Sequence, residues 1–145
     1  VFSSGNYNGS GMNVIAQALD GNACWWWFLV KILFTAITLG SGFKGGEIVP
    51  TFFIGATMGC WAGGLLGLDP GFAAAMGMVA TFCAVVNSPA AAIFLGIEML
   101  GAQGIIYFGV ACGISYMLSG YYGLYGSQKI MYSKIKAEYI NRKAK

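Results

Sequence analysis

Long apolar stretches separated by short polar loops dominate this chain. After a polar, glycine-rich start, one apolar run extends from Trp25 to Leu39 and a second from Ile48 to Leu68. Residues 70–97 and 99–128 contain no Asp, Glu, Lys or Arg, and each stretch exceeds the roughly 20 residues that a helix needs to cross a bilayer. The pattern predicts an all-α, polytopic bundle of transmembrane helices.

The boundaries of the expected segments follow from the turn residues. We expect a loop and a short helix in residues 1–24, membrane helices in residues 25–128 and a basic amphipathic helix over Lys129–Lys145. Asn87-Ser88-Pro89 divides one apolar stretch into two segments that are short for a full crossing. Broken helices of this kind are typical of transporters, where irregular backbone lines a cavity.

The distribution of charged residues predicts the orientation of the chain in the membrane. The chain is 57% hydrophobic and 9% charged, whereas soluble domains contain about 25% charged residues. Six of the eight basic residues lie between Lys129 and Lys145, which predicts a cytoplasmic C-terminus. The same distribution argues against a nucleic-acid partner, because these residues do not lie on a soluble folded face.

Three features inside the apolar runs have two interpretations each. Glycines at every fourth position from Gly55 to Gly67 predict a close helix contact inside one subunit, with a self-dimerising helix as the alternative. Trp25–Trp27 mark a membrane interface or belong to a buried aromatic cluster. Lys31 either snorkels to the interface or faces a polar interior.

Cysteine and histidine usage limits the chemistry. The four cysteines are scattered through apolar segments without a C-x-x-C pair, and we expect all of them to be small buried hydrophobes. The chain contains no histidine, so zinc, haem and Ser-His-Asp sites are not expected. We expect no cofactor, no metal and no enzymatic activity.

The loop before the second apolar run is rich in glycine and ends in a proline. Residues 40–50 read GSGFKGGEIVP, and no further charge follows until Asp69. Pro50 suits the first turn of a helix, where its missing N–H would be unpaired in any case. Glycines let the backbone approach a ligand closely. A helix N-terminus delivered to membrane depth by such a loop is a candidate anion site.

Residues 40–45 also match G-x-G-x-x-G, the spacing of dinucleotide sites. A dinucleotide site requires a preceding strand in a soluble βαβ unit. Here the preceding run is too long and too apolar for a typical strand, so the anion interpretation is favoured.

The same residues carry a family resemblance. Gly46-Glu47-Ile48-Val49-Pro50 resembles the G-x-F-x-P signature of the CLC chloride channels and anion/proton exchangers, with Ile48 in place of Phe. The string GFKGGEIVPTFFIGAT is similar to a prokaryotic branch that includes fluoride/proton exchangers, although members there often have Thr where this chain has Val49. The resemblance covers nearly the whole chain but only the C-terminal part of a family member, so we expect a portion of a larger protein.

The resemblance implies a fold, a site and an assembly. The fold is the C-terminal half of a CLC-type inverted-repeat architecture in the cell membrane, working as a homodimer. The anion is expected at the backbone N–H groups of Gly46, Glu47, Ile48 and Val49, with the Tyr132 hydroxyl across from it. Glu47 is also the candidate proton relay or gate. The implied dimer contact contains Ala90, Ile93, Ile97 and Glu98.

Several alternatives stay open at this point. Chloride is the default anion and fluoride is the sharper alternative, while channel and exchanger are not separated. Glu47 is either a helix cap or a proton carrier, and the role of Glu98 is undecided. The family's other signature loops, including the one with its gating glutamate, are absent, so this chain alone should not transport. A rival hypothesis is a membrane module that serves assembly only.

Overall fold

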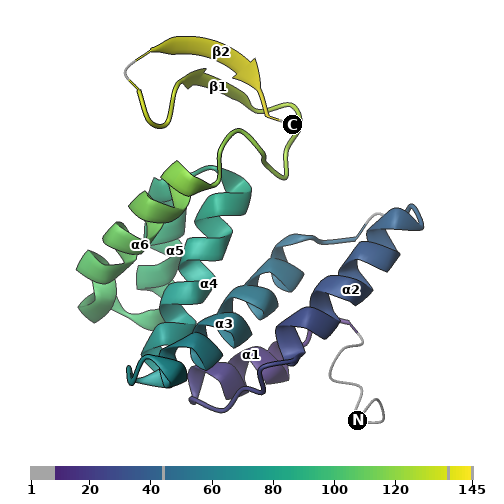
Figure 1. Ribbon diagram of the computed structural model, residues 1–145, viewed down its shortest axis with the longest axis vertical. Coiled ribbons are helices and arrows are strands. Elements are labelled where there is room, and N and C mark those ends of the chain that lie inside the picture. Colours follow the sequence, from purple (N-terminus) through teal and green to yellow (C-terminus); the bar gives the residue numbers. More distant parts are fainter. Residues whose placement is uncertain (1–8, 44, 137, 145) are drawn as a thin grey trace. The chain divides into compact units, whose positions relative to one another are not determined.

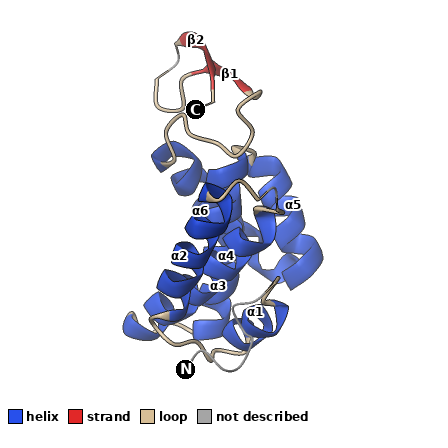
Figure 2. Ribbon diagram, turned by 90° about the vertical axis from the view of Figure 1, so that its right-hand side faces the viewer, coloured by secondary structure: helices blue, strands red, loops and turns tan. Residues whose placement is uncertain are grey.

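The computed structural model describes residues 9–43, 45–136 and 138–144. Residues 1–8 of the expected N-terminal loop and Lys44 of the glycine loop lie outside this range. The described chain contains six α-helices, one 3₁₀ turn and one two-stranded hairpin (Figures 1 and 2). It forms two compact units, Val1–Met78 and Val79–Lys145.

The first unit contains α1 (Met12–Leu19), α2 (Trp27–Gly40), α3 (Ile48–Leu65) and the start of α4 (Pro70–Val86). Both α1 and α2 pack against α3. The predicted short helix and the first two apolar runs are therefore confirmed as helices, and Pro50 lies in the first turn of α3 as expected. Asp69 precedes α4 and caps its first turn, because its Oδ1 accepts a hydrogen bond from the backbone N–H of Phe72 at 3.0 Å.

Glycine sets the distance between α3 and α4. A Cβ added to Gly59 would overlap the carbonyl oxygen of Ala73, and a Cβ added to Gly63 would overlap the side chain of Ala73. The predicted close helix contact inside one subunit is confirmed at these positions. Gly67 differs, because it lies beyond the end of α3 at φ 70° and serves the turn instead.

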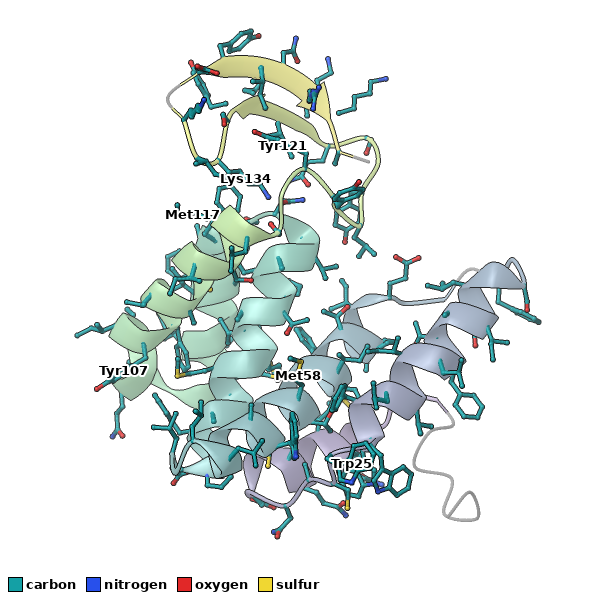
Figure 3. The ribbon with its side chains drawn as sticks, viewed as in Figure 1. Trp25, Met58, Tyr107, Met117, Tyr121 and Lys134 are labelled. Carbon is teal, nitrogen blue, oxygen red and sulfur yellow. The ribbon has the colours of Figure 1, made fainter. Side chains whose placement is uncertain are left out.

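The helix α2 is apolar on its exposed side. Leu33 and Ile37 are 59% and 58% exposed, whereas Lys31 on the same helix is only 4% exposed. In a water-soluble helix the charged residue would face outward and the leucines inward. This inverted arrangement suits a helix in an apolar environment. Trp25, just before α2, is also exposed (Figure 3).

The second unit contains the end of α4, then α5 (Pro89–Leu100), a 3₁₀ turn (Ala102–Gly104) and α6 (Ile105–Leu118). The predicted break is confirmed at Asn87, which has φ 56° and directly precedes Ser88 and the first residue of α5. The α4 and α6 helices are linked by Ser115, whose hydroxyl donates to the Ala80 carbonyl at 2.6 Å. Cys83 and Cys112 are buried in this unit, and Cys60 is buried in the first, but Cys24 is exposed, contrary to the expectation for all four.

The prediction of a basic C-terminal helix is wrong. Lys129–Lys145 forms an antiparallel hairpin of β1 (Lys129–Tyr132) and β2 (Tyr139–Lys143) over its described residues. The strands contain the β-favouring residues Ile130, Tyr132, Tyr139 and Ile140, which helical periodicity did not weigh. The Tyr132 and Tyr139 rings meet edge to face across the strands at 5.6 Å between centroids.

One helix in the described part of the chain, Ile48–Leu65, is long and apolar enough to span a membrane by length and composition. The other apolar helices have 10–17 residues. Helices of these lengths are shorter than the roughly 20 residues of a full crossing, as expected for the segments on both sides of Asn87.

Candidate functional site

A cavity of about 430 Å³ lies beside the start of α3 in the first unit. Its walls come from α2, from the glycine loop and from the first turn of α3. The lining residues are Gly9, Lys31, Phe34, Thr35, Thr38, Leu39, Gly45, Gly46, Glu47 and Pro50. The sequence-predicted loop is therefore next to an accessible space in which a small ion fits.

The glycine loop leaves its backbone uncovered. Gly42 has φ 82°, a conformation that favours glycine, and it follows the end of α2. A Cβ added to Gly45 or Gly46 would meet nothing within 4 Å. These two glycines are therefore not required for packing inside this chain, and they expose main-chain atoms to the cavity.

The first turn of α3 has N–H groups that the helix itself does not use. In any α-helix the first N–H groups have no acceptor within the helix; here these belong to Ile48 and Val49, and Pro50 has none. Thr51 is the first to pair, and its N–H donates to the Glu47 carbonyl at 3.3 Å. The positive end of the helix dipole is added to these donors. This geometry suits an anion.

The Glu47 side chain does not act as a helix cap. Glu47 occupies the N-cap position of α3 with helical backbone angles, φ −83° and ψ −17°, and makes no side-chain capping hydrogen bond. Glu47 is half-buried and is one of the residues that line the cavity. The side chain therefore supplies no capping hydrogen bond, although Glu47 lies at the positive end of the helix dipole.

Lys31 brings a buried cation to the same cavity. Its Nζ donates to the Gly9 carbonyl at 2.9 Å and lies 5.1 Å from the centroid of the Phe53 ring. A buried charge is costly unless it has such partners. Of the two interpretations of Lys31, the structure selects the interior one.

Sequence reasoning left Lys31 out of the site, although a signal was present. Lys31, Thr35 and Thr38 are the polar residues of an otherwise apolar helix, and their spacing of four and three places them on one face. All three line the cavity. The two hydroxyls donate to α2 carbonyls one turn earlier, each at 2.7 Å.

The other predicted site residues lie in the second unit. Tyr132 ends β1 and is 67% exposed. On α5, Ala90 and Glu98 are exposed, and Ile93 and Ile97 are half-buried. These residues share one helix.

Comparison with known proteins identifies the family. The sequence family described as voltage gated chloride channel, or CLC, matches residues 1–120. The chain belongs to the CLC family. This agrees with the resemblance in the glycine loop and confirms the expected all-α fold class, with the C-terminal hairpin as the exception.

Related CLC proteins include channels and exchangers. The chain is 40% identical over 128 residues to a chloride/fluoride channel protein of Pseudomonas syringae pv. tomato, covering 88% of this chain and 28% of that protein. It is 33% identical over 102 residues to an H⁺/Cl⁻ exchange transporter of Vibrio vulnificus, covering 63% of this chain and 22% of that protein.

A solved structure, that of a CLC-type fluoride/proton antiporter, superimposes with a TM-score of 0.79 at 33% identity. The match covers 86% of this chain and 32% of the antiporter. The chain thus spans about a third or less of the length of these relatives.

Proposed function

We propose that this chain forms the C-terminal anion-binding part of a CLC membrane protein that moves small anions across the cell membrane. The observation that carries the proposal is the cavity at the start of α3, where backbone N–H groups and the Lys31 ammonium supply positive potential. The anion lies against the N–H groups around Gly46–Val49, and the family resemblance adds the Tyr132 hydroxyl as a further donor. No covalent chemistry is involved, and no enzymatic role is proposed.

We propose that the protein transports both fluoride and chloride. Relatives named as a chloride/fluoride channel and as a fluoride/proton antiporter support fluoride, together with the Glu that follows the double glycine. Chloride is supported by the wider family and by the exchanger of Vibrio vulnificus. Val49 supplies no hydroxyl, so in this chain the backbone N–H groups carry the recognition in the first turn of α3.

Glu47 is the proposed proton carrier. Glu47 lines the cavity and its side chain makes no capping hydrogen bond, and ionisable groups at membrane depth are usually functional because burying them is costly. A carboxylate beside the anion position can bind a proton on the side toward which the anion leaves and release it on the side from which the anion came, so that the two ions move in opposite directions. This supports exchange of an anion for a proton over a simple channel.

The proposal also includes a dimeric assembly and an orientation in the membrane. The protein works as a homodimer in the lipid bilayer through the face of α5 that contains Ala90, Ile93, Ile97 and Glu98. Phe94, next to Ile93 on this helix, is 71% exposed and offers apolar area for such a contact. The basic hairpin lies in the cytoplasm.

The test uses the full-length protein that contains this chain, reconstituted in liposomes. Efflux of chloride and of fluoride is measured with ion-selective electrodes, and proton uptake is measured in the same vesicles. We expect efflux of at least one of the two anions, coupled to proton uptake. A protein that assembles normally and moves neither anion would instead support the assembly-only module.

A further inference from the structure

The C-terminal hairpin exposes two lysines that face each other across its strands. Lys129 of β1 is the direct cross-strand partner of Lys143 of β2, and both residues are exposed. Directly opposed residues of an antiparallel pair have Cβ atoms about 5 Å apart, and like charges at this distance are destabilising. None of the acidic side chains that the structure describes forms an ion pair with either lysine. Two positive charges therefore lie side by side at the surface.

The neighbouring cross-strand pair shows which face of the hairpin contains these lysines. Ile130 is opposite Arg142 in the register, and Ile130 is buried, while the Arg142 guanidinium lies 5.9 Å from the centroid of the Tyr121 ring. Successive residues of a strand point to opposite faces of a sheet. The face with Ile130 is therefore turned toward the residues before the hairpin, and the face with Lys129 and Lys143 is turned away from them.

The hairpin is held at the ends of two apolar helices of the second unit (Figure 1). The Lys134 ammonium, in the turn between the strands, donates to Asn87 Oδ1 and, at 2.8 Å, to Ser119 Oγ. Asn87 directly follows α4, and Ser119 is the C-cap residue of α6. Where such helices are embedded in a bilayer, their ends lie near the polar headgroups. The hairpin is therefore close to the membrane surface.

Exposed tyrosines gather in the same part of the chain. Tyr122 and Tyr125 lie between α6 and β1, Tyr139 begins β2, and all three are exposed. Tyrosine is enriched at membrane–water interfaces, where the ring lies at headgroup level and the hydroxyl reaches water. Tyrosines together with a pair of like-charged lysines fit a bilayer surface that carries negative charge.

We propose that the hairpin face with Lys129 and Lys143 binds the phosphate of an acidic phospholipid. The phosphate lies between the two ammonium groups and offsets the repulsion between them. Acidic lipids give the cytoplasmic leaflet its negative surface potential, so this site agrees with the proposed orientation of the hairpin. The inference needs the membrane location of the chain, but it does not depend on the proposed anion transport.

The test measures lipid binding to the full-length protein that contains this chain. The protein is purified in a neutral detergent and transferred to about 0.15 M ammonium acetate, an ionic strength at which charges are screened beyond about 8 Å. Native mass spectrometry then gives the dissociation constant of the first bound lipid during titration with dioleoyl phosphatidylglycerol. Dioleoyl phosphatidylcholine, which is zwitterionic, is the comparison. We expect the unmutated protein to bind phosphatidylglycerol more tightly.

Lys143→Glu separates lipid binding from hairpin stability. It places a carboxylate opposite Lys129, so that an attractive cross-strand pair replaces a repulsive one and the hairpin stays folded. We expect the affinity for phosphatidylglycerol to fall at least tenfold, because one basic residue near an anionic surface contributes about fivefold and is here replaced by an acid.

The matched control is Lys136→Glu, the same change of charge at an exposed position between the two strands. Lys136 lies at the closed end of the hairpin, whereas Lys129 and Lys143 lie at its open end. A strand of four residues separates the two ends by about 10 Å, so screening should limit the loss of affinity in Lys136→Glu to about twofold.

Three results would overturn the proposal. Equal losses in Lys143→Glu and Lys136→Glu would mean a general attraction of the basic segment to acidic lipid, without a site. Unchanged affinity in Lys143→Glu would exclude this lysine from lipid binding. Equal affinity of the unmutated protein for the two lipids would mean that the lysine pair serves a different partner. If Lys143→Glu does not fold, Lys143→Met replaces it, with an expected loss of about fivefold.

Discussion

Gly59 and Gly77 pack face to face, one from α3 and the other from α4. A Cβ added to Gly77 would lie 2.9 Å from the Gly59 Cα, and a Cβ added to Gly59 would lie 3.1 Å from the Gly77 Cα. Ordinary carbon contacts begin at about 3.5 Å. The two backbones are therefore in direct contact, and a side chain at either position would push the helices apart.

The first prediction concerns this contact. Gly59→Leu should destabilise the protein by about 3 kcal/mol or more, because the inserted side chain must displace the backbone of α4. The matched control is Gly64→Leu, since a Cβ at Gly64 meets nothing within 4 Å. Thermal unfolding and size-exclusion chromatography of the full-length variants in detergent measure the difference. Equal behaviour of the two variants would mean that the α3–α4 contact does not hold the fold together.

The second prediction concerns Lys31. Lys31→Met should fold, because it replaces a buried cation by an apolar side chain of similar length and leaves no unpaired charge behind. It should raise the anion concentration needed for half-maximal efflux by about tenfold, since the cavity loses its cation. Lys136→Met, an exposed position on the hairpin, is the control. If Lys31→Met leaves the anion concentration for half-maximal efflux unchanged, Lys31 has only a structural role through its hydrogen bond to the Gly9 carbonyl.

The third prediction concerns Glu47. Glu47→Gln keeps the size and the hydrogen-bonding oxygen of the side chain, but its amide cannot take up or release a proton. Proton uptake should fall at least tenfold, while the dissociation constant of the anion changes little, because the backbone N–H groups remain. Glu138→Gln, exposed in the hairpin, controls for the loss of one negative charge. Unchanged proton and anion fluxes in Glu47→Gln would return this residue to a structural role.

The fourth prediction concerns the hairpin and the membrane. A cysteine at Glu138, which is exposed, should be protected from impermeant thiol reagents in intact cells and labelled after permeabilisation, since the basic segment is expected in the cytoplasm. Cys24 is also exposed, so the experiment needs a Cys24→Ser background. Ready labelling in intact cells would place the hairpin outside. Ala144 is a poor label position, because it is only 6% exposed.

The sequence by itself determined the helical character of the chain before the C-terminal segment and the candidate anion loop. Charge-free stretches and their turn residues predicted the helices, the break at Asn87 and the start of α3 at Pro50, because these depend on local chemistry such as proline geometry and helix boundaries. The spacing of Gly59 and Gly63 also predicted a close contact, since a period of four places glycines on one helix face.

Only the tertiary structure decided which side chains share the cavity and how the C-terminal segment folds. Lys31 and Glu47 are 16 positions apart, and their common cavity depends on the packing of α2 against α3. Residues 129–143 are compatible with an amphipathic helix but also contain β-favouring residues at the positions of the two strands. The hairpin is stabilised by cross-strand and long-range contacts, including those of Lys134 with Asn87 and Ser119. A pattern within one segment contains no information on such partners, so contacts between distant residues decide between two locally acceptable structures.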